Sequence, residues 1–218
     1  MLQYAAVTSG AKDIVSKPYI HVTDNAVMNS LLMREAFENE VKHFIFPSCS
    51  IMYQSNDNLI KETDFDETVD INPNYYGAGN TKVYLEKMCK FYSSFGKTKF
   101  TDLRQSNVWG DGQEERDLLH VSDLVNCVHA ILEHQKSDYE LINVGYGKSV
   151  KISELVEKIL DIYNRDVYIK YDTTKPTIKT KLGLDIQKAK RLFGWTPKVT
   201  LSRGIKKTID YYKNTKRL

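Results

Sequence analysis

A run of tyrosines, glycines and one lysine decides the fold: Pro73-Asn74-Tyr75-Tyr76-Gly77-Ala78-Gly79-Asn80-Thr81-Lys82-Val83-Tyr84-Leu85-Glu86-Lys87. Proline and glycine interrupt regular structure before Asn80, a good capping residue, so we expect a helix to open there. After it, apolar residues recur at helical spacing, at Tyr84, Met88, Phe91 and Tyr92. Two tyrosines, Tyr75 and Tyr76, and Lys82 are therefore expected near the N-terminus of a helix. A nearby positive charge lowers the pKa of a phenol, and such a pair can exchange a proton with an alcohol or ketone.

Four further motifs follow one another in a recognisable order. They are Ser48-Cys49-Ser50-Ile51-Met52-Tyr53, Leu103-Arg104-Gln105-Ser106-Asn107-Val108, Trp109-Gly110-Asp111-Gly112 and Arg116-Asp117-Leu118-Leu119-His120-Val121. With the tyrosine and lysine run between the first two, this order resembles the extended short-chain dehydrogenase/reductase family, the NAD(P)-dependent epimerases, dehydratases and reductases of nucleotide sugars. The opening Ala5-Ala6-Val7-Thr8-Ser9-Gly10 is most similar to the GDP-L-fucose synthase group. The resemblance extends from about residue 2 to residue 212.

Predicted strands and helices alternate along the chain. A strand at 2–6, a helix at 25–40 and a strand at 42–47 form a unit typical of a parallel sheet. The sequence therefore predicts an α/β protein with a Rossmann-like parallel sheet and a small C-terminal α/β substrate domain. The remaining predicted strands are 98–104, 116–121, 139–144 and 167–171, and the remaining helices begin at 80, 122, 152, 186 and 201.

The resemblance also implies two gaps. The chain begins at what would be the fourth strand of the usual fold, and Val108-Trp109 joins two motifs that several tens of residues separate in the family. We expect a partial dinucleotide-binding domain at 1–108. Residues 109–218 would combine returning Rossmann elements with the substrate-binding subdomain. A fragment, a spliced record and a reduced homologue all fit these gaps.

The family pattern Tyr-x-x-x-Lys implies that Tyr76 and Lys82 are the acid/base pair. Here the two are six residues apart, and Ala78 stands four residues before Lys82. Six residues of unbroken helix turn through about 600°, which would place the two on different sides. A helix that begins after Gly79-Asn80 would leave Tyr76 on the entering loop. Tyr75 is the alternative phenol, simple aromatic packing is the third interpretation, and a surface pair with Glu86 is the structural alternative for Lys82.

Ser48, Cys49 and Ser50 follow the second predicted strand, at the edge where open parallel sheets bind ligands. The family places a catalytic Ser or Thr four residues before the tyrosine that corresponds to Tyr53, and that position is Cys49. A thiol is a weaker hydrogen-bond donor than a hydroxyl, so Ser48 or Ser50 could take this role. An ordinary strand-end turn is the competing interpretation.

The resemblance implies NAD or NADP as the cofactor, with Ala5, Ala6, Asn25 and Lys82 beside it. The family's glycine-rich phosphate turn is not present in this chain. Gly77-Ala78-Gly79 and Gly145-Tyr146-Gly147 lack the spacing of such a turn and are interpreted as ordinary turns.

The resemblance assigns three residues to a nucleotide-diphosphate sugar: Asn107, Arg116 and Lys181. An arginine suits a diphosphate because its guanidinium donates in a fork. The structural alternative for Arg116 is an ion pair with a nearby acid. Residue 181 is a lysine where relatives often carry arginine, and this difference weakens the argument that residue 181 binds the diphosphate through two parallel hydrogen bonds.

Composition argues against several other classes of protein. A formal charge of +3, from 31 basic and 28 acidic residues, does not demand nucleic acid or an anionic membrane. The cysteines, Cys49, Cys89 and Cys127, are far apart and suggest neither a disulfide framework nor a zinc site. The five histidines show no metal spacing. We expect a soluble, cytoplasmic protein without a metal, which could form a homodimer.

These features predict hydride transfer at a sugar C4 by an NAD(P)-dependent epimerase, dehydratase or reductase, with Tyr/Lys proton chemistry. The alternative is a truncated, non-catalytic homologue that binds nucleotide sugars without redox chemistry.

Overall fold

A three-stranded parallel sheet forms the centre of the protein. The computed structural model describes residues 1–7, 16–105, 114–163, 167, 169 and 180–215. Its strands are β1 (His43–Pro47), β2 (Lys99–Arg104) and β4 (Tyr139–Asn143), in the order β1-β2-β4. The β1 sequence is a continuous apolar run, Phe44-Ile45-Phe46, as expected for a strand buried on both faces. The prediction of a Rossmann-like α/β fold with a parallel sheet is confirmed.

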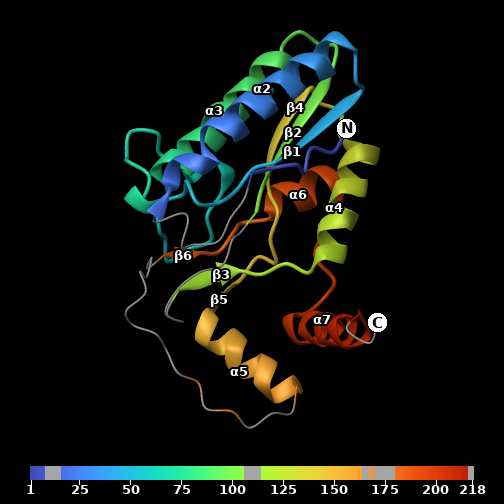
Figure 1. Cartoon of the computed structure of the whole chain (residues 1–218). Helices are drawn as coiled ribbons and strands as arrows, with labels where there is room; N and C mark the ends of the chain where they lie inside the picture. The colour runs from blue at the N-terminus through green and yellow to red at the C-terminus, as the bar shows by residue number, and fades with distance from the viewer. Residues whose placement is uncertain (8–15, 106–113, 164–166, 168, 170–179, 216–218) are drawn as a thin grey trace.

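Helices cover both faces of this sheet (Figure 1). Helices α2 (Thr23–Glu38) and α3 (Tyr76–Ser93) pack on one face, against Phe44, Phe46 and Phe100. Helices α4 (Val121–His134) and α6 (Gln187–Phe193) pack on the other, against Ile45 and Leu103. Complete burial of each such side chain stabilises the fold by about 1.5–3 kcal/mol. The three layers therefore carry most of the core.

A second, smaller sheet lies below the first. It has the order β5-β3-β6, with β5 at Ser149–Lys151, β3 at Glu115–Asp117 and β6 at Lys181–Leu182. The Asp117 carboxylate, at the end of β3, binds the segments before β5 and after β6 by accepting hydrogen bonds from the N–H groups of Gly147 (2.9 Å) and Leu184 (3.2 Å). A Cβ at Gly145 would lie 2.7 Å from the same carboxyl group, so only glycine allows this approach. Helices α5 (Ile152–Tyr163) and α7 (Leu201–Thr215) extend beyond this sheet (Figure 1).

The prediction that a helix opens at Asn80 is wrong, because α3 begins at Tyr76 and runs unbroken through both glycines. A short 3-10 helix, η3 (Pro73–Tyr75), leads directly into it, and two others are η1 (Pro18–His21) and η2 (Glu62–Asp64). The Asn80 side chain does not cap a helix but donates to the Tyr76 carbonyl, at 2.8 Å. Gly79 lets the helix approach Ile71, which a Cβ would meet at 3.0 Å.

The apolar residues at helical spacing in α2 and α3 are divided between core and solvent, because Leu32, Met88 and Tyr92 pack against the core while others are exposed. Val27 (54%), Leu31 (47%), Tyr84 (43%) and Phe91 (53%) are all exposed. The buried positions of α2 are instead Asn25, Asn29, Met33 and Ala36. The two asparagines are buried because their amides bind the backbone of the N-terminal segment and of α2.

Three predicted boundaries also change. Residues 2–6 do not form a buried strand, because only Leu2 pairs with Ile45 and the Leu2 side chain is 51% exposed. Strand β3 ends at Asp117, and His120 rather than Ser122 caps α4, since its side chain accepts from the Ser122 N–H. Of the strand predicted at 167–171, only residues 167 and 169 are among the described residues.

Candidate active site at the carboxyl edge of the sheet

The turn Ser48–Ser50 follows β1 at the edge where the parallel strands end. All three of its residues are buried, and the Ser50 N–H donates to the carbonyl of Gln105, just past the end of β2, at 3.0 Å. Burial raises the pKa of the Cys49 thiol to about 11, so the thiol is protonated at neutral pH. The turn is thus a buried, uncharged corner of the site.

Lys82 reaches this corner from α3. Its ammonium donates to the carbonyl of Pro47 at 2.8 Å and lies 4.4 Å from the centre of the Phe46 ring. Burial lowers the pKa of Lys82, while Cys49 and the acidic groups behind it act in the opposite direction. The structure therefore brings Lys82 and the Ser48–Ser50 turn together at the end of β1.

Tyr75 and Tyr76 occupy different environments. Tyr75 is 6% exposed and packs in a cluster with Cys49, Met52 and Ile71, whereas Tyr76 is 54% exposed. Because α3 is unbroken from Tyr76, the structure does not put Tyr76 and Lys82 on one helical face. Of the two phenols, Tyr75 is the one beside Cys49.

The Arg116 guanidinium links Tyr75 to the small sheet. Burial, the largest influence, raises the pKa of Tyr75, and a hydrogen bond from Arg116 lowers it. Arg116 is 1% exposed and forms an ion pair with Glu114 at 3.1 Å. It also donates to the Thr180 carbonyl at 3.2 Å. Arg116 would have to exchange one of these partners to hold a diphosphate.

A buried ionic network lies behind the turn. The Glu86 carboxylate accepts from the Ser48 hydroxyl at 2.6 Å and from the Arg104 guanidinium at 3.0 Å and 2.6 Å. Both charged side chains are at most 6% exposed. Glu86 pairs with Arg104 rather than forming the surface pair with Lys82 that its spacing allows. The hydrogen of the Ser48 hydroxyl is directed at Glu86, so only its lone pairs remain for other partners.

Sequence reasoning did not find Arg104 and Asp102 as members of this region. Asp102 is fully buried in β2; its Oδ2 accepts from the Tyr139 hydroxyl at 2.8 Å and its Oδ1 has no hydrogen-bond partner. Burial and the charge of Glu86 raise the pKa of Asp102 well above its ordinary value. The charged residues Asp102 and Arg104, on either side of Leu103, were the available signal, since a central parallel strand is usually apolar.

The predicted cofactor residues lie on the outer side of β1. The Asn25 amide clamps Val7, accepting from its N–H and donating to its carbonyl, both at 2.9 Å. This clamp fixes the segment on which Ala5 and Ala6 are exposed. Asn25 thus shapes the backbone at this edge, and the two alanines leave it accessible.

The structure does not bring the predicted substrate residues Lys181 and Asn107 together. Lys181 in β6 lies 3.4 Å from Asp57 and 3.8 Å from Glu115, paired with these acids near the surface. Asn107 lies outside the described residues. Among the residues that the structure describes, no group of three or more His, Cys, Asp or Glu side chains is arranged to hold a metal ion.

Two family models cover the chain between them. The model described as NAD dependent epimerase/dehydratase family matches residues 1–110, and the model described as GDP-mannose 4,6 dehydratase matches residues 96–208. Each match covers about half of the chain. The chain belongs to the NAD dependent epimerase/dehydratase family.

Curated proteins match half of the chain or nearly all of it. Putative GDP-L-fucose synthase 2 of Arabidopsis thaliana is 37% identical over 119 residues, which is 54% of this chain and 35% of that protein. GDP-L-colitose synthase of Yersinia pseudotuberculosis is 22% identical over 252 aligned positions, covering 99% of this chain and 82% of that protein. The chain spans about a third of the length of the first curated relatives it matches.

Solved structures align with almost the whole chain. UDP-glucose 4-epimerase from Thermotoga maritima with UDP-glucose aligns with a TM-score of 0.83 and 25% identity, covering 98% of this chain and 77% of that one. MoeE5 in complex with UDP-glucuronic acid and NAD aligns with a TM-score of 0.85 and 18% identity, covering 98% and 79%. The similarity to MoeE5 supports the fold alone. Within the described residues, none of the helices combines the length and apolarity that a bilayer crossing needs.

Proposed function

We propose that this chain carries the sugar-oxidising edge of an NAD(P)-dependent enzyme that modifies a nucleotide-diphosphate sugar at C4. The observation that carries the proposal is that Lys82 and Tyr75 each lie beside the Ser48–Ser50 turn at the carboxyl end of β1. Family membership and the nucleotide-sugar names of the relatives support it. Epimerisation and dehydration can begin with removal of a hydride at C4, and 4-keto reduction is the reverse of that step.

The residues present suit the nicotinamide end of a cofactor. Lys82 offers an ammonium at the strand end, and the exposed Ala5 and Ala6 leave the neighbouring backbone open. When bound, the nicotinamide supplies or accepts the hydride at C4. Lys82 would bind ribose hydroxyls with the donor protons that Pro47 does not use.

Proton transfer falls to a phenol. As the C4 alcohol becomes a ketone it gives up a hydride from carbon and a proton from oxygen, and the proton passes to the phenolate; reduction of a 4-keto group runs the same steps backwards. We propose Tyr75 as this group because of its place beside Cys49, with Tyr76 as the alternative that the family pattern suggests. Ser48 and Ser50 would orient the sugar oxygen, and Cys49 would contribute shape rather than charge.

Substrate binding follows from the neighbouring cations. Arg116, which already contacts Tyr75, would hold the diphosphate after giving up part of its hydrogen bonding to Glu114 or Thr180. Lys181, on the adjacent strand, would add a second positive charge, and Asn107 would face the sugar.

Titration of NADH and NADPH fluorescence with the purified chain tests the proposal. We expect saturable binding that Lys82→Met weakens at least about tenfold, since a charged hydrogen bond contributes about 1.5–3 kcal/mol. Lys87→Met is the matched control, because Lys87 lies on the same helix but is exposed and paired with Glu67. Absence of binding to either nucleotide would contradict the proposal.

A second measurement separates the two phenols and the non-catalytic alternative. Turnover of a UDP-hexose and a GDP-hexose should fall at least about 100-fold in Tyr75→Phe and little in Tyr76→Phe. The reverse order would assign the role to Tyr76. Calorimetric binding of the sugars with no NAD(P)H binding would support the truncated homologue, which the enzyme names of the relatives do not favour.

A further inference from the structure

Helix α3 contacts two consecutive residues at the end of β1. The Lys82 ammonium donates to the Pro47 carbonyl at 2.8 Å, and the Glu86 carboxylate accepts from the Ser48 hydroxyl at 2.6 Å. Lys82 and Glu86 are four residues apart, so they lie on the same face of the helix, about one turn from each other. The distance between Lys82 and the turn that follows β1 is therefore set by two contacts with one helix.

The ion pair of Glu86 with Arg104 extends this contact to the far end of the segment 48–53. Arg104 Nη2 lies 2.6 Å from Glu86 Oε2, and Arg104 Cζ lies 4.8 Å from the centre of the Tyr53 ring. The Tyr53 side chain is 4% exposed, so this contact is buried. Ser48 and Tyr53 are the first and last residues of the segment, and the buried ion pair thus contacts both of its ends.

The carboxylate of Glu86 satisfies three donors at once. Its Oε1 accepts from the Ser48 hydroxyl and from Arg104 Nε, at 3.0 Å, and its Oε2 accepts from Arg104 Nη2. Glutamine at this position would offer one acceptor oxygen and one donor group in place of two oxygens, so a donor would face a donor. Because the pair is buried and charged, these hydrogen bonds are stronger than those between neutral groups.

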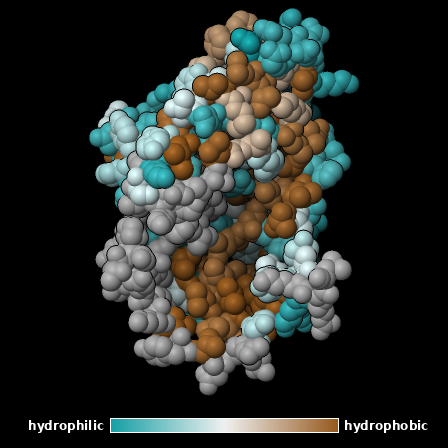
Figure 2. Space-filling model, in the orientation of Figure 1, coloured by the Kyte–Doolittle hydropathy of each residue, from teal (hydrophilic) through white to brown (hydrophobic). Residues whose placement is uncertain are grey.

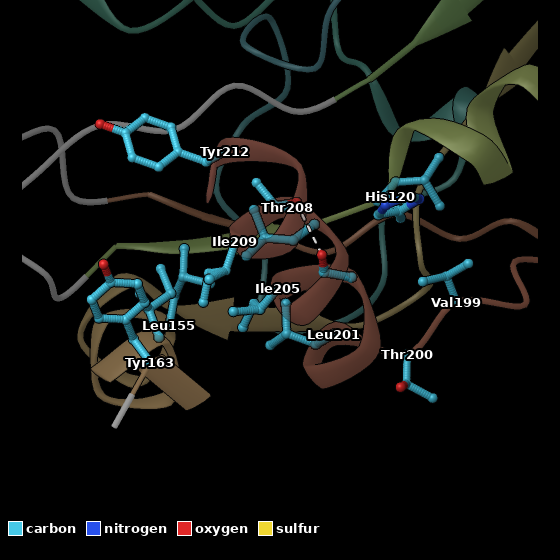
Figure 3. Close-up of a pocket in the computed structure, with 14 residues that line it drawn as sticks. His120, Leu155, Tyr163, Val199, Thr200, Leu201, Ile205, Thr208, Ile209 and Tyr212 are labelled. Atoms are coloured by element: carbon cyan, nitrogen blue, oxygen red, sulfur yellow. Dashed lines mark hydrogen bonds between the residues drawn. The ribbon is translucent and has the colours of Figure 1, made fainter. Parts of the chain in front are cut away.

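A second region of the described protein has the opposite character. An apolar hollow of about 500 Å³ lies between α5 and α7, where hydrophobic residues gather on the lower part of the molecule (Figure 2). Leu155, Ile205 and Ile209 are among the side chains that line it (Figure 3). None of its lining residues belongs to the candidate site. A substitution in this hollow therefore changes packing without touching the segment 48–53.

We propose that Glu86 and Arg104 are positioning residues, which clamp the segment 48–53 and so fix the Ser48–Ser50 turn relative to Lys82. This inference rests on the proposed function, in which the turn orients the sugar and Lys82 binds the cofactor ribose. A bound ribose would compete with Pro47 for the Lys82 ammonium. The hydrogen bond between Ser48 and Glu86 is the contact that would keep the turn in place when that happens.

Labelling of buried thiols with N-ethylmaleimide tests the clamp in the chain without any ligand. Cys49 lies in the turn and Cys127 lies in α4, on the other face of the sheet, and both are buried, so each reacts only when its surroundings open. Peptide mass spectrometry gives the ratio of the two rates. We expect Glu86→Gln and Ser48→Ala each to raise the ratio of Cys49 to Cys127 labelling at least about tenfold. The double variant should raise it by less than the product of the two single effects, because both remove the same contact.

Two control variants separate the clamp from general loss of stability. Ser93→Ala removes another buried serine hydroxyl of α3, which donates to the Lys90 carbonyl at 2.6 Å, and Leu155→Ala removes packing at the hollow. Both should leave the ratio unchanged. Equal acceleration of the two thiols in Glu86→Gln would overturn the proposal, because the ion pair would then only stabilise the fold. If far-UV circular dichroism shows that Glu86→Gln does not fold, Ser48→Ala decides, and an unchanged ratio in that variant would overturn the proposal.

Kinetics distinguish this inference from the proposed function. With the hexose nucleotide that the wild-type chain turns over, Glu86→Gln should lower kcat at least about tenfold, since misplaced groups lose much of their effect. The dissociation constant of NADH should not change, because Lys82 is retained. Equal losses in kcat and in NADH affinity would contradict a positioning role. A wild-type chain that binds no NADH would contradict the proposed function alone, since the thiol ratio is measured without ligand.

Discussion

The helix pairs α2/α3 and α5/α7 differ in where they place their apolar side chains. The first pair buries Met33, Ala36, Leu85 and Cys89 against the sheet, together with polar groups such as Asn29 and Glu86, and leaves Val27, Leu31 and Phe91 exposed. The second pair turns its apolar residues toward a hollow between the helices. Helical periodicity identifies both pairs as helices, but which side is covered depends on what lies next to each one.

The largest expected effect comes from breaking the polar layer under α3. Glu86→Ala would leave the Arg104 guanidinium buried without its carboxylate, so we expect a loss of about 3–5 kcal/mol in the free energy of unfolding. Urea denaturation measures it. Lys87→Ala, which removes an exposed ion pair from the same helix, should cost about 0–1 kcal/mol. Equal losses in the two variants would show that the Glu86–Arg104 pair is not buried as described.

Replacing one leucine by alanine in each helix pair allows the packing of the two pairs to be compared. Leu85 on α3 is fully buried, so Leu85→Ala should cost about 2–5 kcal/mol through lost burial and a residual cavity. Leu155 on α5 already borders the hollow and is only half-buried, so Leu155→Ala should cost about 1 kcal/mol. Thermal or urea unfolding gives both values. A reversed order would mean that α5 is the better packed helix.

Acid should weaken the sheet layer through His43. Burial lowers the pKa of His43 from 6.5 to about 4, so the unfolded chain gains a proton at this residue at higher pH than the fold does. Its contribution is therefore complete above pH 6.5 and is lost progressively as the pH falls toward 4. His43→Gln should flatten the dependence of unfolding free energy on pH in this window, whereas the exposed His129→Gln should not. An unchanged pH profile in His43→Gln would contradict this assignment.

The smallest effect on stability is expected at the exposed stripe of α2 and α3. Leu31→Glu should alter the free energy of unfolding by no more than about 0.5 kcal/mol, because the side chain is 47% exposed. If the protein forms a homodimer through this face, the same variant should halve its mass in sedimentation. Ser202→Glu, on the exposed side of α7, is the control. A dimer that survives in Leu31→Glu would place the interface elsewhere.

At the candidate site, features that depend on neighbouring residues in the sequence could be predicted, whereas features that depend on tertiary contacts could not. Short apolar runs and turn residues identified β1, β2 and the Ser48–Ser50 corner, and the family motif identified Lys82. The choice between Tyr75 and Tyr76 could not be made that way. It depends on where α3 begins, and the helix begins at Tyr76 and continues through Gly77 and Gly79.

Local sequence was sufficient for the alternation of strands and helices, because hydrogen bonds within a helix and the two-sided burial of a parallel strand leave a periodic trace. It was not sufficient for the pairing of Glu86 with Arg104, the clamp of Asn25 on Val7, or the hollow between α5 and α7. Each of these joins residues that are distant in the chain and becomes favourable only where neighbouring elements exclude water. The spacing of residues in the sequence does not show where neighbouring elements exclude water, so only the tertiary structure reveals these contacts.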